Sequence, residues 1–278
     1  MRRWIGVLLG VFILSACSTR FVYNWLDWLI PWELDDYVSL SRAQERQLDE
    51  MIEQALAWHK ANELPRYVQH IEALQSDVAE PLQAAQIQGH FDRSNGHWDR
   101  LFEHLIPALI PFIQSFSDAQ IDEALANMAK DEAELREEYA ELTLEQRIAK
   151  SNKSMEQSIR KKIGRLSKQQ KAIIHDYNHN RHSTLALWLS YRDVWFERFS
   201  LALYQRSDGA ALERELRLLM VEPDQLKSAQ YLTLIEQNRR QLSQGFAAIH
   251  QSMSSKQQRR LNKELGKLRA DFIYLAQP

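Results

Sequence analysis

The chain has 278 residues, of which 45% are hydrophobic and 26% are charged, and its formal net charge is −2. This composition is sufficient for a sizeable globular core and excludes disorder of the chain as a whole. Because only one cysteine is present, an internal disulfide framework and a cysteine-based zinc or iron–sulfur site are excluded. Eight glycines and seven prolines leave few turn positions, which favours helices over strands.

The first sixteen residues, 1–16, have the pattern of a secretory signal peptide. Arg2 and Arg3 precede an apolar run from Trp4 to Leu14, which is too short for a comfortable membrane span. The ending Leu-Ser-Ala-Cys resembles a bacterial lipobox. The resemblance implies cleavage between Ala16 and Cys17, acyl chains on Cys17 as the membrane anchor, and an outer-membrane location facing the periplasm. The alternative is an ordinary signal peptide or an N-terminal membrane anchor with a free thiol.

Residues 17–39 form an aromatic segment next to the expected anchor. Its bulky residues fall on one helical stripe: Phe21, Trp25, Trp28, Leu29 and Trp32. Pro31 is expected to end or bend this helix. Tryptophan rings favour the headgroup level of a membrane, so one interpretation is that the stripe lies on lipid. The alternative is that the stripe packs on helices of the same chain.

Residues 40–278 are interpreted as one all-helical periplasmic domain with a recurring helix-start signal. At five positions an apolar residue is followed by Ser or Thr and, three residues later, by Gln, which is typical of a capping box. The five boxes are Ser41–Gln44, Ser117–Gln120, Thr143–Gln146, Ser167–Gln170 and Ser254–Gln257. The first two and the last two lie at similar separations, which raises the hypothesis of an internal duplication.

Helix breaks are expected at Pro and Gly positions between the periodic segments. They are Pro65, Pro81, Pro107, Pro111, Asp208-Gly209 and Pro223. Together with the caps they predict eight or nine helices, and no alternating strand pattern competes. A long central helix is expected over residues 167–206, because apolar residues fill a wide face there. The predicted fold class is all-α, an antiparallel multi-helix bundle with short loops.

Two resemblances follow from these motifs. The segment from Leu142 to Gln146, Leu-Thr-Leu-Glu-Gln, matches the Leu-Thr-x-x-Gln motif of the Spy and CpxP periplasmic chaperones, all-helical proteins that cradle unfolded clients. The lipobox, the stretch from Tyr23 to Trp32 and the segment from Asp35 to Val38 resemble a widespread group of proteobacterial lipoproteins of unknown function. The first resemblance implies a chaperone-like role, and the second implies no particular activity.

A steep reversal of charge lies in the middle of the chain. Seven acidic residues against one basic residue occupy 131–145, and nine basic residues against Glu156 alone occupy 147–171. The basic run indicates a surface for an anionic partner, either an envelope protein or an envelope polymer. Its candidate binding residues are Arg160, Lys161, Lys162, Arg165 and Lys168. The alternative is a hairpin whose acidic and basic arms pair with each other. The nearly balanced net charge argues against nucleic acid as a partner.

Three histidines supply a candidate metal site. His175, His179 and His182 have the i, i+4, i+7 spacing that would place three imidazoles on one helical face. Periplasmic metal binding is therefore the second functional hypothesis, with a hydrated helix face as its alternative. No phosphate loop, serine-hydrolase elbow or zinc-protease motif is present. We therefore expect no catalytic residue and no cofactor, and an envelope hydrolase is the third hypothesis. The first is a non-enzymatic binding, scaffold or chaperone-like lipoprotein.

Overall fold

The computed structural model describes residues 19–277. The expected signal peptide, its cleavage site at Ala16 and the expected lipid attachment at Cys17 lie outside the described residues. The described part contains eleven α-helices, one short 3-10 helix and no strand, which confirms the all-α class. The elements are α2 (Thr19–Tyr23), α3 (Leu26–Asp35), α4 (Arg42–Asp77), α5 (Ala84–Gln114), α6 (Asp118–Ala140), α7 (Leu144–Ile163), α8 (Lys168–Asn180), α9 (Leu185–Tyr204), α10 (Gly209–Met220), η1 (Pro223–Leu226), α11 (Ala229–Gln251) and α12 (Ser255–Leu275).

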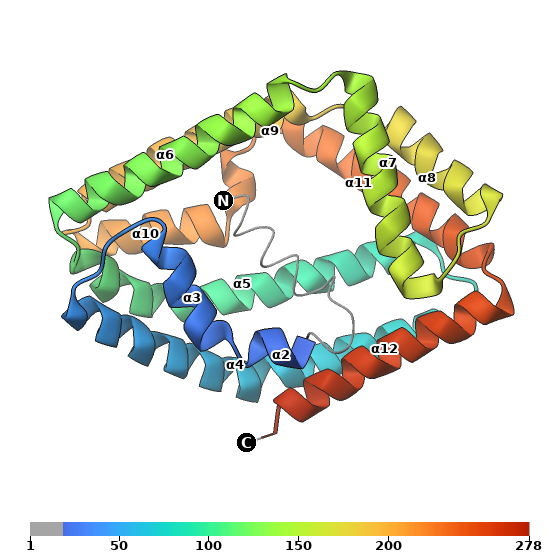
Figure 1. Cartoon of the computed structure of the whole chain (residues 1–278), viewed down its shortest axis with the longest axis horizontal. Coiled ribbons are helices and arrows are strands. Elements are labelled where there is room, and N and C mark those ends of the chain that lie inside the picture. Colours follow the sequence, from blue (N-terminus) through green and yellow to red (C-terminus); the bar gives the residue numbers. More distant parts are fainter. Residues whose placement is uncertain (1–18, 278) are drawn as a thin grey trace.

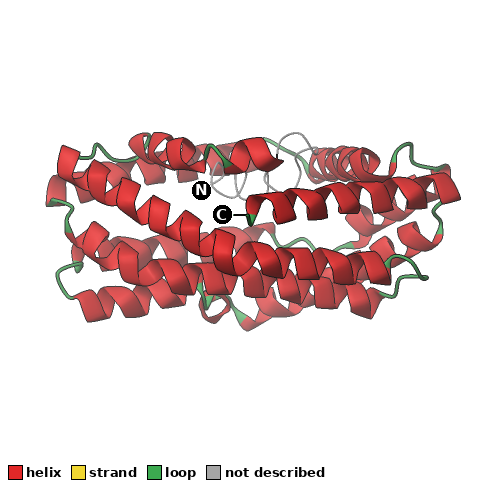
Figure 2. Cartoon of the chain, turned by 90° about the horizontal axis from the view of Figure 1, so that it is seen from below, coloured by secondary structure: helices red, strands yellow, loops and turns green. Residues whose placement is uncertain are grey.

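The helices follow one another around a flat, closed frame (Figure 1). The long helices α4 and α5 run across the frame, while α6 and α7 meet at the opposite edge. Seen from the side, the frame is much longer than it is thick (Figure 2). The short helices α2 and α3 lie on α12 and α4, respectively. None of the described helices is long and apolar enough to span a membrane.

Two cores at opposite ends of the frame hold the helices together. At one end Ile106 of α5 and Ile121 of α6 are fully buried in a core that also includes residues of α4, α9 and α10. At the other end Ile163 and Ile174 lie in a smaller core with residues of α11 and α12. Each buried Ile contributes about 1.5–3 kcal/mol by leaving water. Because α4 packs on α3, α5 and α12, and α5 packs on α10 and α11, the two long helices connect both ends.

The number of helices is higher than the predicted eight or nine, partly because helix 167–206 was predicted wrongly. This segment forms two helices, α8 and α9, separated by residues 181–184. Arg181 has extended backbone angles. The backbone N–H of His182 donates to Asn238 Oδ1 at 2.8 Å, and Asn238 Nδ2 donates to the His182 carbonyl at 2.9 Å. The Asn238 side chain of α11 thus bonds the backbone groups of His182 that lack helical partners at the break.

Several prolines do not break helices as expected. Pro65 lies inside α4, and Pro107 and Pro111 lie inside α5. All three are exposed, so the carbonyl four residues earlier, which loses its helical partner, can bind water instead. Pro31 also lies inside a helix, α3. By contrast, Pro81 lies in the connection between α4 and α5, as predicted.

All five predicted capping boxes are formed, at the starts of α4, α6, α7, α8 and α12. In each box the Ser or Thr hydroxyl accepts from the Gln backbone N–H, and the Gln side chain accepts from the cap N–H. A sixth box, Gln83 with Gln86, begins α5. It was not predicted because glutamine is an unusual cap residue.

The first two boxes meet at one corner of the frame through their glutamines. Gln44 Nε2 donates to Gln120 Oε1 at 3.1 Å, and Gln120 Nε2 donates to Gln44 Oε1 at 2.8 Å. The remaining amide protons go to backbone carbonyls of the partner segment, at Ser115 for Gln44 (2.9 Å) and at Ser39 for Gln120 (2.8 Å). Both side-chain amides are thereby fully hydrogen-bonded.

The last two boxes repeat this arrangement at another corner. Gln170 Nε2 donates to Gln257 Oε1 at 3.2 Å, and Gln257 Nε2 donates to Gln170 Oε1 at 2.9 Å. Their second amide protons go to the carbonyls of Ser252 (3.4 Å) and Arg165 (3.0 Å). The two pairs that meet are the two pairs with similar separations along the sequence. We call each of these arrangements a box pair.

Candidate functional site

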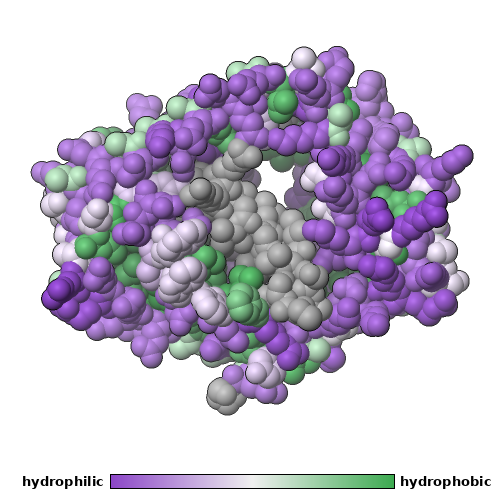
Figure 3. All heavy atoms as spheres, in the orientation of Figure 1, coloured by the Kyte–Doolittle hydropathy of each residue, from purple (hydrophilic) through white to green (hydrophobic). Residues whose placement is uncertain are grey.

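Basic residues of α7, α8 and α12 gather at one corner of the frame, which we call the basic corner. α7 packs on both α8 and α12, and Arg260 Nη2 donates to the Lys161 carbonyl at 3.2 Å. The residues predicted from the sequence are Arg160, Lys161, Lys162, Arg165 and Lys168, and α12 adds Lys256, Arg259, Arg260 and Lys263. In Figure 3 the surface over α7 and the start of α12 is mainly hydrophilic.

The charges of the basic corner are not neutralised by carboxylates of residues 19–277. Glu156, the one acidic residue of the basic run, forms ion pairs with Lys171 and His175 instead. Glu264 of α12 pairs with Lys267. The helix N-termini of α8 and α12 lie at this corner together with the C-termini of α7 and α11, so the helix dipoles oppose each other and the positive charge comes from the side chains. The basic corner therefore presents a group of cationic side chains that no described carboxylate neutralises.

The acidic run does not fold back onto the basic run. α6, which carries most of the acidic residues, packs mainly on α9. Of the ion pairs between described residues, one joins the two runs, from Lys150 to Glu138. The hairpin alternative therefore fails for the basic corner, because α6 and α7 diverge at the edge of the frame (Figure 1).

The structure does not bring the three predicted metal ligands together on one helical face. α8 ends at Asn180, so His182 lies outside the helix that carries His175 and His179. His175 Nε2 instead lies 2.8 Å from Glu156 Oε1. Within residues 19–277, no group of three or more His, Cys, Asp or Glu side chains is placed to hold a metal ion. The expected helical face does not form because α8 ends between His179 and His182, so the histidine spacing is interrupted by a break in the helix.

The aromatic stripe is exposed rather than packed on the protein's own helices. The exposed fractions are 58% for Phe21, 47% for Trp25, 55% for Trp28 and 49% for Trp32. Neighbouring rings touch, with centroids 5.2–5.8 Å apart. The opposite side of these helices, which includes Tyr23, packs into cores with α4 and α12. We call the four exposed rings the aromatic face.

A row of three histidines lies between α4 and α5. His90 Nδ1 is 3.0 Å from His70 Nε2, and His70 Nδ1 is 3.2 Å from His97 Nε2. A carboxylate closes each end, because Asp77 Oδ2 lies 3.0 Å from His90 Nε2 and Glu63 Oε2 lies 3.1 Å from His97 Nδ1. Glu63 is completely buried, and His90 and His97 are both 8% exposed. We call this arrangement the histidine row.

The protonation of the histidine row follows from its hydrogen bonds. Four contacts connect the two carboxylates through the three imidazoles. Three neutral imidazoles supply only three N–H donors, so one contact lacks a donor. Arg100 supplies a further donor, since its Nη2 lies 2.6 Å from His97 Nδ1 and 2.9 Å from Glu63 Oε2. If each imidazole then donates in the direction of Asp77, every polar atom of the row has a partner while all three histidines are neutral.

Burial keeps part of the histidine row neutral. It lowers the pKa of His70 to about 4, and the neighbouring His90 and His97 act in the same direction. Burial also lowers the pKa of His97. For Glu63, burial acts to raise the pKa, but the hydrogen bonds and charge of Arg100 outweigh it and leave the pKa below the usual range. The row thus pairs a buried anion with an arginine, and burial favours the uncharged form of His70 and His97.

Sequence reasoning missed the histidine row, although a signal for it exists. Glu63, His70 and Asp77 recur every seven residues on α4, and His90 and His97 have the same spacing on α5. Seven residues make almost two helical turns, so each set shares one helix face. Two such polar sets on consecutive helices indicate a buried network when the helices pack antiparallel.

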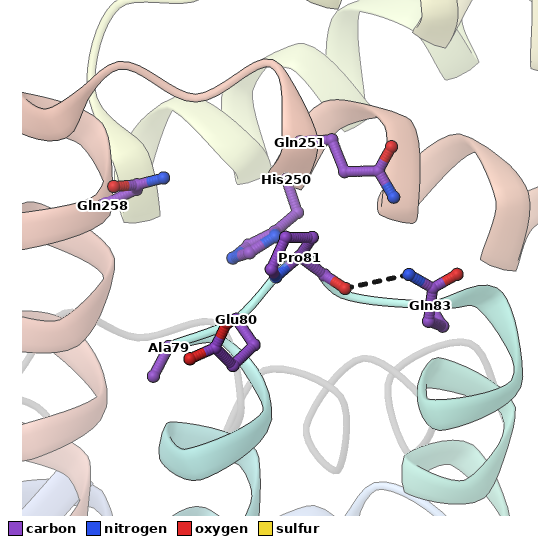
Figure 4. Close-up of a pocket in the computed structure, with 7 residues that line it drawn as sticks. All are labelled: Ala79, Glu80, Pro81, Gln83, His250, Gln251 and Gln258. Atoms are coloured by element: carbon purple, nitrogen blue, oxygen red, sulfur yellow. Dashed lines mark hydrogen bonds between the residues drawn. The ribbon is translucent and has the colours of Figure 1, made fainter.

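A pocket of about 440 Å³ lies where the α4–α5 connection meets the α11–α12 connection (Figure 4). His250 is one of the residues that line the pocket, but both of its ring nitrogens already form hydrogen bonds within the protein. Its Nδ1 accepts from the Leu82 N–H at 3.3 Å, and its Nε2 donates to the Val78 carbonyl at 3.1 Å. His250 therefore fastens the two connections together and has no free nitrogen for a ligand.

These features define an all-helical frame with one unneutralised basic corner and a buried polar row. The chain belongs to a family of unknown function, DUF6279, which matches residues 36–232. The match includes the histidine row and the α7 and α8 parts of the basic corner. The expectation of an uncharacterised family is thus confirmed. No curated protein and no solved structure matches the chain.

Proposed function

We propose that this protein is a non-enzymatic lipoprotein of the outer membrane that faces the periplasm and acts as a scaffold or chaperone-like protein. Its partner is an anionic protein or polymer of the envelope, held on the basic corner. The observation that carries this proposal is the gathering of cations from three helices without a carboxylate of residues 19–277 to neutralise them. Unpaired charges of one sign raise the local concentration of an oppositely charged partner and speed its arrival.

The proposed anchor is Cys17, for which the lipobox is the support. The aromatic face begins only four residues later, at Phe21, and it is exposed. Tryptophan and phenylalanine rings next to an acylated residue suit the interface between headgroups and acyl chains. The two features together support a molecule that rests on the membrane through its aromatic face.

The chaperone-like part of the proposal is supported by the Thr143–Gln146 box, which matches the Leu-Thr-x-x-Gln motif most closely. The other boxes have Ser in place of Thr. The frame shape and the basic corner are compatible with holding a partner by surface contacts, without a chemical step. Binding of this kind weakens as salt rises, because exposed charges are screened over about 10 Å at 0.1 M salt.

Crosslinking in cells tests the proposal. A photo-crosslinking amino acid at Lys161 of the full-length protein should capture an acidic or phosphate-rich partner. Charge reversal of its neighbours, Lys162→Glu, Arg165→Glu and Lys168→Glu, should remove these adducts, because opposite charges then repel the partner.

The matched control reverses three exposed basic residues that lie away from the corner, with Arg42→Glu, Arg46→Glu and Lys130→Glu. This control should keep the adducts at Lys161. If both triple variants give the same adducts as the parent, charge does not select the partner and the proposal is wrong.

A further inference from the structure

The five capping boxes with a Ser or Thr cap differ in one respect. Four of them are joined in the two box pairs. The fifth, Thr143–Gln146, lies at the turn between α6 and α7, at an outer corner of the frame (Figure 1). It is exposed and pairs with no other box in the described part of the chain.

Each box pair is built from two equivalent halves. On both sides a glutamine Nε2 donates to the partner's glutamine Oε1 and to the partner's carbonyl two residues before the cap. This holds for Gln44 with Gln120 and for Gln170 with Gln257. A surface that pairs in this way is complementary to itself, so two identical boxes can pair across a twofold axis.

The fifth box has every group that the pairing needs. The Thr143 N–H donates to Gln146 Oε1 at 2.8 Å, and the Gln146 N–H donates to Thr143 Oγ1 at 3.3 Å. These bonds hold the glutamine in the same local arrangement as in the paired boxes. Among residues 19–277, neither Gln146 Nε2 nor the carbonyl of Glu141, two residues before the cap, forms a hydrogen bond.

The apolar residues of the fifth box are also left without a core. In the paired boxes the residue before each cap packs in a core of the frame; these residues are Leu40, Phe116, Leu166 and Met253. The corresponding Leu142 belongs to none of the four cores formed by described residues. Leu144, the first residue of α7, is 51% exposed. A partner at this corner would therefore bury apolar surface and satisfy polar groups together.

We propose that the fifth box is the contact through which a second copy of this chain binds, with Gln146 of each copy hydrogen-bonded to Gln146 of the other. The occupant is a second copy because the box pairs within the chain are self-complementary and the fifth box carries the same groups. The dimer has twofold symmetry and forms at the α6–α7 corner. The inference does not depend on the basic corner or on its partner.

Crosslinking at the proposed contact tests the dimer. A photo-crosslinking amino acid in place of Leu144 in the full-length protein should give an adduct of twice the mass of the chain. Gln146→Glu keeps an acceptor for the Thr143 N–H, so the capping box survives. It removes both amide protons and places like charges opposite each other, which should reduce the adduct about fivefold or more.

The control is Gln157→Glu, which makes the same charge change at an exposed position of α7. It should leave the yield of the double-mass adduct unchanged. Adducts only with other proteins, or an equal yield in the two variants, would overturn the proposal. Charge reversal at the basic corner should also leave the adduct unchanged, so failure of the proposed function and failure of this dimer are distinguishable.

Discussion

At the scale of single residues, Arg100 determines how the histidine row can be protonated. Its bonds to Glu63 and His97 allow the imidazoles to stay neutral without an unsatisfied nitrogen. An extra proton at low pH would compete with Arg100 for His97 Nδ1. His59 is a further buried histidine with both ring nitrogens in contact with polar groups. The hydroxyls of Tyr23 and Tyr67 lie 3.0 and 3.1 Å from these nitrogens, and burial lowers the pKa of His59 to about 4.

We expect this burial to make the protein sensitive to acid. The pKa of His70 is about 4 in the folded protein and about 6.5 in an unfolded chain. The unfolded chain therefore binds the proton first, so the contribution of His70 is complete above about pH 6.5 and is lost as the pH falls toward 4. Urea unfolding should show a loss of up to about 1.4 kcal/mol per pH unit for each such histidine.

The variant His70→Asn should lose stability less steeply than the parent between pH 6.5 and pH 4. His179→Asn, at an exposed position of α8, should keep the slope of the parent. Equal slopes in all three proteins would mean that His70 takes up its proton in the folded state without cost.

At the scale of elements, the box pairs fix where helices α4, α6, α8 and α12 begin relative to each other. Gln170 is completely buried, and its amide is bound by Gln257 on both sides. A local capping motif is thereby also a tertiary contact. The fifth box has only the local part.

Replacing a paired glutamine should therefore cost more than replacing the unpaired one. Gln170→Met leaves the buried amide of Gln257 without its partner, which should lower the free energy of unfolding by about 2 kcal/mol. Gln146→Met removes only the acceptor for the cap N–H, and about 0.5–1 kcal/mol should be lost. Urea unfolding at low protein concentration measures both. Equal losses would show that the box pairs contribute nothing beyond capping.

These contacts show how far the sequence predicts the fold. The five boxes were predictable because the cap at Ser41, for example, depends only on a residue three positions away. The glutamine pairing was not, because Gln44 and Gln120 meet only after the helices pack. The breaks at Pro65 and Pro107 were predicted wrongly, since the pattern does not tell whether a proline faces water. The residues of the basic corner from α7 and α8 were predicted from the sequence. The contribution of Arg260 was not, because it depends on the packing of α12 on α7.

At the scale of the whole molecule, the aromatic face and the cores lie on opposite sides of α2 and α3. The inner side packs into the cores, which fixes the outer side as one continuous row of rings. A rigid row of rings can orient the frame on a membrane, whereas a flexible acyl chain can only tether it.

Fluorescence quenching by brominated lipids tests this orientation. Tryptophan emission of the protein on vesicles should be quenched, and Trp25→Phe, Trp28→Phe and Trp32→Phe together should remove most of the quenching. The control variant Trp58→Phe, Trp98→Phe and Trp195→Phe changes tryptophans of α4, α5 and α9 and should keep it. Unchanged quenching in the first variant would place the aromatic face away from lipid.

The first and last described helices, α2 and α12, touch where α12 also packs on α4. Arg20 Nε of α2 lies 2.5 Å from Asp271 Oδ1, and the same guanidinium lies 4.2 Å from the centre of the Tyr274 ring of α12. Because these two segments touch, a short linker could join them and the backbone could instead be opened at the exposed residues 207–208 between α9 and α10. We expect such a circularly permuted chain to keep the packing of the described helices, because the shape of the frame then depends on which helices touch and not on where the polypeptide is cut.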